Sequence, residues 1–171
     1  MSASIQIDAR VDGLEALSAA LARMNALGER PHPIWEAIGN YGENSTRLRF
    51  ARGRDPERKP WVTSIRVRNQ GGQTLVLKAQ LMRSISHTAD NSGAAWGTNK
   101  KYASTHQFGA VIKAKGAGAL RFRIPGAGFA TVKAVKIPAR PFLGVNADDG
   151  REMLALAHAA IDLAAKNRGQ A

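Results

Sequence analysis

The chain has 171 residues, a length that fits one domain with a sizeable core. Hydrophobic residues make up 44% of it, which excludes wholesale disorder, and the absence of cysteine excludes disulfides and thiolate metal sites. The formal net charge is +12, and residues 58–147 carry 15 basic residues against a single acid, Asp90. A field of that sign favours an anionic partner, either nucleic acid or an acidic protein surface.

The chain shows no targeting or membrane-spanning pattern. Its first residues lack a charged stretch followed by an apolar one, so no secretory signal is expected. No apolar run approaches the roughly 20 residues that a membrane-spanning helix needs. We therefore expect a soluble protein that is made inside the cell and has no membrane partner.

The first elements follow from hydrophobic periodicity. Alternating apolar and polar residues predict a strand over residues 4–11. Asp12 can then cap a helix that ends at Gly28, because apolar residues recur between them at spacings of three and four.

A second helix and a loop come next. The helix is expected from near Pro33 to Phe50, with Gly39 and Gly42 weakening its middle. Glycine and prolines then rule out regular structure over residues 53–60, which we predict to be a basic, mobile loop.

The middle of the chain mixes short elements. The arginines of "SIRVRN" (residues 64–69) are two apart, which on a strand places both charges on one face. Residues 74–87 predict a short helix, with Leu77, Leu81 and Ile85 on one face. Residues 94–110 predict a strand, a turn and then a strand or a short helical turn, with Phe108 in the core.

The last third predicts a hairpin and a helix. Residues 120–124 and 131–137 alternate between apolar and polar side chains and are bordered by glycine-rich turns, so they are expected to pair, with a second mobile region near residues 114–130. Asp148 and Asp149 can cap a final helix, and residues 167–171 are expected to fray.

This order of elements predicts the fold class. We expect one α+β domain over residues 1–171, with helices packed on one side of a largely antiparallel sheet, an N-terminal strand and a C-terminal helix.

The sequence contains no recognisable active-site pattern, so we predict that the protein is not an enzyme. His32, His87, His106 and His158 show no metal-binding spacing, and no carboxylates lie beside them in the sequence. No serine lies in a nucleophile motif, and the glycine-rich stretch at residues 116–129 lacks the phosphate-binding pattern. We expect no catalytic residues, no metal and no cofactor.

The basic residues of the middle block instead predict a binding surface. They occur mostly as pairs two residues apart, which would form basic stripes on strands, although solvated faces or lysines that protect a sheet edge are alternatives. The pairs are Arg66 and Arg68, Lys100 and Lys101, Lys113 and Lys115, Arg121 and Arg123, and Lys133 and Lys136.

The segment "KIPARPFLG" (residues 136–144) has the composition of a docking element. Pro138 and Pro141 fix φ and remove two backbone donors, so they hold Arg140 and Phe142 in a set direction. Phe142 could be the apolar anchor of a contact with a neighbouring subunit, and Arg140 could bind a carboxylate of that neighbour. Alternatively, the segment folds back over a sheet edge of its own subunit, and the sequence leaves both possibilities open.

Two blocks of the second half resemble a known family. "GTNKKYASTHQFG" (residues 97–109) precedes a variable hairpin, and "IPARPFLG" (residues 137–144) follows it. In this order the blocks resemble the phage virion morphogenesis family, the tail completion or head–tail joining proteins of tailed bacteriophages. The loop before Trp61 departs from the more regular turn of that family.

The resemblance implies a structural virion protein, assembled in the host cytoplasm and located at the head–tail junction. It implies a homo-oligomeric ring, commonly six-fold, that contacts the tail tube protein and the head connector or neck proteins, with DNA contact through phosphates as a further possibility. The predicted interface residues are Trp61, Tyr102, His106, Gln107, Pro138, Arg140, Pro141 and Phe142. A basic protein that binds DNA without reading sequence is the alternative function.

Overall fold

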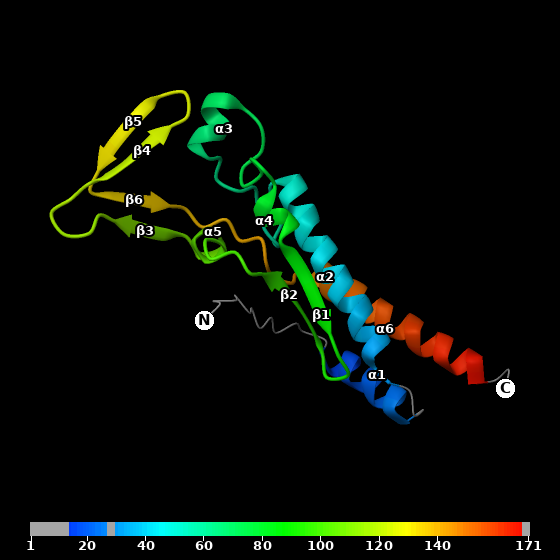
Figure 1. Ribbon diagram of the computed structural model, residues 1–171. Coiled ribbons are helices and arrows are strands. Elements are labelled where there is room, and N and C mark those ends of the chain that lie inside the picture. Colours follow the sequence, from blue (N-terminus) through cyan, green and yellow to red (C-terminus); the bar gives the residue numbers. More distant parts are fainter. Residues whose placement is uncertain (1–13, 27–29, 169–171) are drawn as a thin grey trace. The chain divides into compact units, whose positions relative to one another are not determined.

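The computed structural model describes residues 14–26 and 30–168 of the chain, and Figure 1 shows its elements. The predicted first strand and the caps at Asp12 and Gly28 lie outside these residues. The chain divides into two compact units. Among the described residues, unit 1 comprises residues 47–84 and 98–143, and unit 2 comprises residues 14–26, 30–46, 85–97 and 144–168.

Unit 2 is built around three helices. Helix α1 spans Leu14–Ala26, α2 spans His32–Arg52 and continues into unit 1, and α6 spans Ala147–Arg168, which confirms the predicted helices at these places. One buried cluster joins the three, because each contributes two apolar side chains at helical spacing. Its members are Ala20, Met24, Ile34, Ile38, Met153 and Ala157.

Strands β1 (Ile85–Ala89) and β2 (Ala94–Thr98) pair and lie against α2 within unit 2. The two glycines that seemed to weaken α2 make this approach possible. A Cβ atom at Gly42 would lie 2.4 Å from Cδ2 of Trp96, and one at Gly39 would lie 2.8 Å from Cδ2 of His87. Larger residues at either position would therefore push the strands off the helix.

Helix α6 begins with a reciprocal capping arrangement. The Asp149 backbone N–H donates to Oδ1 of Asn146 at 2.8 Å, and the Asn146 N–H donates to Oδ2 of Asp149 at 3.0 Å. The predicted capping role of Asp149 is thus confirmed, while the N-cap is Asn146. Oδ1 of Asp149 accepts from the hydroxyls of Tyr41 and Ser45, and burial together with the Asp149 charge raises the pKa of Tyr41 to about 12.

Helix α6 continues through the first two residues of the predicted frayed tail, and residues 169–171 lie outside the described part of the chain.

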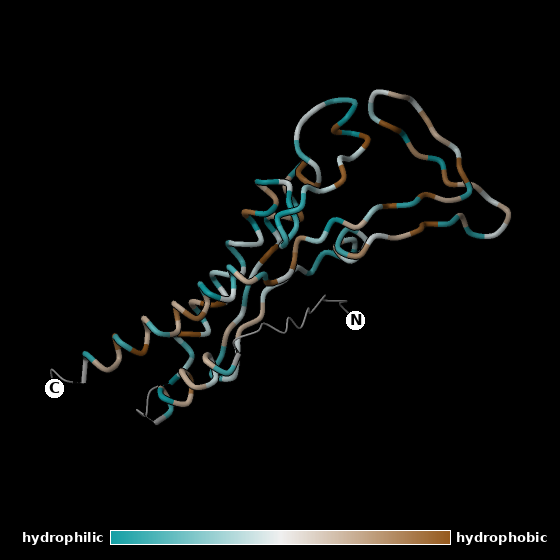
Figure 2. The backbone as a smooth tube through the Cα atoms, turned by 180° about the vertical axis from the view of Figure 1, so that it is seen from behind, coloured by the Kyte–Doolittle hydropathy of each residue, from teal (hydrophilic) through white to brown (hydrophobic). Residues whose placement is uncertain are grey.

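Unit 1 contains three short helices and four strands. The helices are α3 (Ile65–Gln70), α4 (Gln80–Arg83) and α5 (Ala103–Phe108). The strands are β3 (Ala110–Lys113), β4 (Leu120–Ile124), β5 (Gly128–Val132) and β6 (Ala134–Ile137). Hydrophobic and hydrophilic residues alternate along β4, whose sequence is LRFRI, as Figure 2 shows.

The strands form two-stranded ribbons rather than one sheet. Within the described residues, β1 pairs with β2, β3 with β6 and β4 with β5. The last two pairs are antiparallel, so the predicted α+β class, antiparallel pairing and C-terminal helix are confirmed. The predicted partner of residues 120–124 was wrong in part: residues 128–132 pair there, whereas β6 pairs with β3.

Two predictions for the middle of the chain were wrong. Residues 64–69 are not a strand, because Oγ of Ser64 accepts from the Val67 N–H at 3.3 Å and caps helix α3. Residues 74–87 are not one helix. Leu75 and Ala79 have φ of 65° and 53°, which confines the helix to Gln80–Arg83, and strand β1 starts at Ile85.

The basic loop at residues 53–60 is closed by backbone hydrogen bonds. The Asp55 N–H donates to the carbonyl of Lys59 at 2.9 Å, and the Trp61 N–H donates to that of Gly53 at 2.9 Å. The mobility of this loop stays a prediction. No helix in the described ranges has the length and apolar character needed to cross a membrane.

Candidate functional site

The two sequence blocks that carry the family resemblance bind each other in unit 1. Gln107, at the end of α5, is 5% exposed, and both the oxygen and the nitrogen of its side-chain amide form hydrogen bonds. Its Oε1 accepts from the backbone N–H groups of Phe142 and Leu143, both at 3.0 Å, and its Nε2 donates to the Leu143 carbonyl at 2.9 Å. We call this arrangement the motif junction.

Gly109 completes the motif junction. Its φ is 74°, and a Cβ there would lie 2.9 Å from the backbone nitrogen of Ala139 and from the carbonyl oxygen of Ile137. The glycine that ends "HQFG" therefore lets the "IPA" backbone approach closely.

Aromatic packing and further hydrogen bonds fix the other side of the "PARPF" segment. The Phe142 ring is fully buried and lies 5.2 Å from the Phe50 ring, which meets Trp61 edge-on at 5.4 Å. Trp61 Nε1 donates to the Pro141 carbonyl at 2.8 Å, and Arg49 Nη1 donates to the Phe142 carbonyl at 3.1 Å. The chain therefore folds this segment into its own core.

This packing corrects several interface predictions. Phe142 cannot anchor a neighbouring subunit, because its ring is 0% exposed, and Trp61 and Gln107 are 7% and 5% exposed. Phe108, expected in the core, is 64% exposed. Pro138 and Pro141 are half-buried, whereas Tyr102 is 43% exposed.

Arg140 and His106 lie side by side at the edge of the motif junction. Arg140 is 6% exposed; its backbone N–H donates to the His106 carbonyl at 2.7 Å, and its Nε donates to the Val62 carbonyl at 2.7 Å. Burial lowers the pKa of Arg140, and burial together with the Arg140 charge lowers that of His106. Both effects favour the neutral form of His106, and its buried Nδ1 has no hydrogen-bond partner in the described structure.

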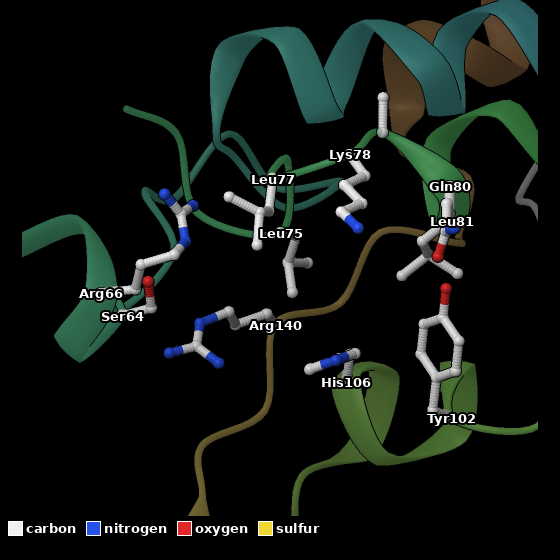
Figure 3. A pocket seen from close by; sticks show the side chains of 11 residues that line it. Ser64, Arg66, Leu75, Leu77, Lys78, Gln80, Leu81, Tyr102, His106 and Arg140 are labelled. Atoms are coloured by element: carbon white, nitrogen blue, oxygen red, sulfur yellow. The ribbon is translucent and has the colours of Figure 1, made fainter. Parts of the chain in front are cut away.

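These two residues line a pocket of about 350 Å³ within unit 1. Figure 3 shows how the side chains converge on it from α3, the strained segment before α4, α5 and the "PARPF" segment. The lining includes three cations and no acid; its main members are Arg66, Leu75, Leu77, Lys78, Leu81, Tyr102, His106 and Arg140. We call it the cationic pocket.

The predicted basic residues all lie in unit 1, but they do not form one surface pattern. Arg121 and Arg123 share one face of β4, as predicted, and the Arg121 guanidinium lies 5.1 Å from the centre of the Phe129 ring. Lys113 and Lys136 share one face of the β3–β6 ribbon by register. Arg68, Lys101, Lys115 and Lys133 are exposed outside strands, and Lys100 is half-buried before α5.

Arg66 was predicted to lie on a strand but belongs to helix α3. Its guanidinium donates to the carbonyls of Gly71 and Gln73, so part of its function is to hold the following loop. On a helix, Arg66 and Arg68 do not share a face.

The ribbons of unit 1 also expose apolar side chains. Val111 and Ile112 on β3 are 58% and 43% exposed, and Phe122 and Phe129 are 36% and 68% exposed. An isolated two-stranded ribbon is only marginally stable in water. Exposed apolar side chains on such a ribbon are typical of surfaces that bind another protein.

Sequence reasoning missed a polar cluster in unit 2. His87 Nδ1 lies 2.6 Å from Oε2 of Glu43, and His87 Nε2 lies 3.1 Å from Oε1 of Glu36. The hydrogen bond to Glu43, followed by that to Glu36, raises the pKa of His87. The carboxylates precede His87 by more than forty residues, so no local motif indicated the cluster. Across the part of the chain that the structure covers, no group of acidic and histidine side chains is arranged to hold a metal ion.

Among its described residues, unit 1 thus combines a cationic pocket, exposed ribbons and a hydrogen-bonded junction between two sequence motifs. Residues 12–162 match the phage virion morphogenesis family, and the chain belongs to this family.

A relative from Haemophilus influenzae, Mu-like prophage FluMu G protein 2, is 30% identical over 148 residues, which cover 86% of this chain and 91% of the relative. No solved structure matches the chain. The protein is therefore a virion-associated protein of phage assembly.

Proposed function

We propose that this protein acts at the head–tail junction of a tailed phage, where it completes the tail or joins it to the capsid. It does so as a structural subunit of a ring, commonly of six copies, and not as an enzyme. Its partners are the tail tube protein and the head connector or neck proteins. It assembles in the host cytoplasm and remains in the virion.

The observation that carries this proposal is the combination of family membership with the exposed ribbons of unit 1. A joining protein must contact several partners, and the ribbons offer backbone edges, exposed apolar side chains and basic faces in one region of the chain.

The charge of unit 1 supports an anionic target. Its described residues include 19 basic side chains and only two acidic ones, Asp55 and Glu57. Such a surface suits either acidic faces of the connector and tail tube or the phosphates of DNA that passes through a ring.

Extract complementation tests the joining function. A phage that lacks the gene is induced, and purified protein is added to its lysate. We expect infectious particles to appear in proportion to the added protein, and the Phe142→Ala variant, which disrupts the core, to serve as an inactive control. Lysates that are fully infectious before any addition would contradict the proposal.

The alternative function, DNA binding without sequence readout, is favoured by one specific observation. Arg121, Arg123 and Phe129 share one face of the β4–β5 ribbon, a combination of cations and an aromatic ring that suits a nucleic-acid backbone. Tight binding of the isolated protein to duplex DNA, with a steep loss of affinity as salt rises, would favour this function.

A further inference from the structure

The cationic pocket holds positive charge that no acidic residue among its described lining neutralises. Arg140 is 6% exposed and its Nε donates to a carbonyl, yet none of the described residues that line the pocket carries a carboxylate. The two acids among the described residues of unit 1, Asp55 and Glu57, are not among the lining residues. Lys78 adds a second, exposed cation to the same space (Figure 3). An uncompensated charge at a buried site favours an anionic ligand.

The walls of the pocket are partly apolar, so its ligand is also expected to carry an apolar group. Leu77 is 70% exposed and Tyr102 is 43% exposed at its edge, and Leu75 and Leu81 contribute further apolar surface. Free phosphate would leave this surface unused. A carboxylate next to an aliphatic side chain would contact both the cations and the apolar walls of the pocket. The expected ligand is therefore a protein segment that carries an acidic residue beside an apolar one.

The backbone of the wall is strained in a way that is typical of binding sites. Leu75 and Ala79 both have positive φ, a conformation that is unfavourable for residues other than glycine. Both residues line the pocket, and together they turn Leu77 and Lys78 toward solvent.

We propose that the cationic pocket binds helix α6 of a second copy of this chain, with Asp162 opposite Lys78 and Arg140 and with Leu163 against Leu75 and Leu77. This contact rests on the proposed ring and assigns the surfaces that form it. Because it joins unit 1 of one copy to unit 2 of the next, it is heterologous and can close into a ring.

The chain itself supplies the complementary surface. The described residues of unit 2 include eight acidic and five basic side chains, against 19 basic and two acidic ones in unit 1. Leu163 is 60% exposed, which gives α6 a large apolar side chain at its surface. The exposed carboxylate of Asp162 precedes it directly on α6.

Charge reversal tests this contact without touching the core, because Lys78 and Asp162 are both exposed. Sedimentation velocity over a range of concentrations measures self-association. We expect the wild type to associate, and Lys78→Glu and Asp162→Lys each to weaken association about tenfold or more. The double variant should recover most of the loss. Lys133→Glu, a reversal elsewhere in unit 1, is the matched control and should have a smaller effect.

Covalent trapping provides a second measurement. The chain has no cysteine, so a variant with Lys78→Cys and Leu163→Cys can form only engineered disulfides. We expect oxidation to give a ladder of multimers, whereas Lys133→Cys with Leu163→Cys should give much less. A wild type that stays monomeric, a double reversal that fails to recover association, or equal ladders from both cysteine pairs would overturn the inference.

Extract complementation separates this inference from the proposed function. If the protein restores infectivity but the reversals and cysteine pairs behave like their controls, the contact is wrong and the joining function stands. If the contact is confirmed but infectivity is not restored, the joining function is wrong.

Discussion

Replacing Gln107 by methionine should strongly destabilise the protein, because the Gln107 amide holds the "PARPF" segment through three buried hydrogen bonds. Methionine is similar in length and apolar, so it fills much of the same space. It cannot accept from the N–H groups of Phe142 and Leu143 or donate to the Leu143 carbonyl, which are bound at 3.0, 3.0 and 2.9 Å in the wild type.

The magnitude follows from the number of groups left without a partner. A buried backbone donor or acceptor that loses its partner costs about 1–3 kcal/mol, and three such groups set an upper limit of about 9 kcal/mol. Because local relaxation recovers part of this cost, we expect a loss of about 3–5 kcal/mol in the free energy of unfolding, a large part of the usual stability of a domain.

Urea unfolding monitored by tryptophan fluorescence measures the effect, since Trp61 packs beside Phe50 at the motif junction. Gln70→Met makes the same chemical change at an exposed position and should alter stability by less than about 0.5 kcal/mol. A loss below about 1 kcal/mol for Gln107→Met would refute the role given to these hydrogen bonds.

Three further predictions concern other parts of the chain. Gly42→Ala should lower the free energy of unfolding by about 1–3 kcal/mol in a denaturant titration, because the new Cβ would lie 2.4 Å from Trp96; unchanged stability would contradict the close packing. The raised pKa of His87 means that its contribution to stability is complete below about pH 6.5 and is lost as pH rises through the folded-state pKa. Thermal melts across this range should show a decline for the wild type that is weaker for His87→Gln, and parallel curves would count against the ion pairs. Arg121→Glu with Arg123→Glu should leave circular dichroism and melting temperature unchanged but block head–tail joining, and normal joining would show that this basic face has no role.

The long helices were predictable because their signals are local. Helices α2 and α6 carry apolar residues at helical spacing, and the acids at the start of α6 marked its first turn. The pairing of β6 with β3 was not predictable in the same way, because residues 134–137 alternate like any strand and their partner lies more than twenty residues upstream.

The errors in unit 1 have two physical causes. The alternation in "SIRVRN" fits a strand, but the Ser64 cap starts a helix instead. One helix was expected over residues 74–87, but Leu75 and Ala79 have positive φ, which interrupts a helix. No residue type in the segment indicates these backbone conformations.

The motif junction shows what a sequence block can and cannot convey. "HQFG" and "IPARPFLG" indicated the family correctly. They also suggested that Phe142 could lie at a subunit interface, whereas its ring packs against Phe50 inside the chain. The two blocks belong together because Gln107 forms hydrogen bonds to the backbone of the second block and Gly109 lets that backbone approach closely. Exposure of Phe108 next to buried Gln107 could not be read from the block itself.

The central claim, a role in joining the tail to the head, is tested most directly by deleting the gene from the phage or prophage that carries it and imaging the induced lysate by negative-stain electron microscopy. We expect filled heads beside separate tails, or overlong and ragged tails if the protein ends tail growth. Intact, infectious virions in that lysate would contradict it.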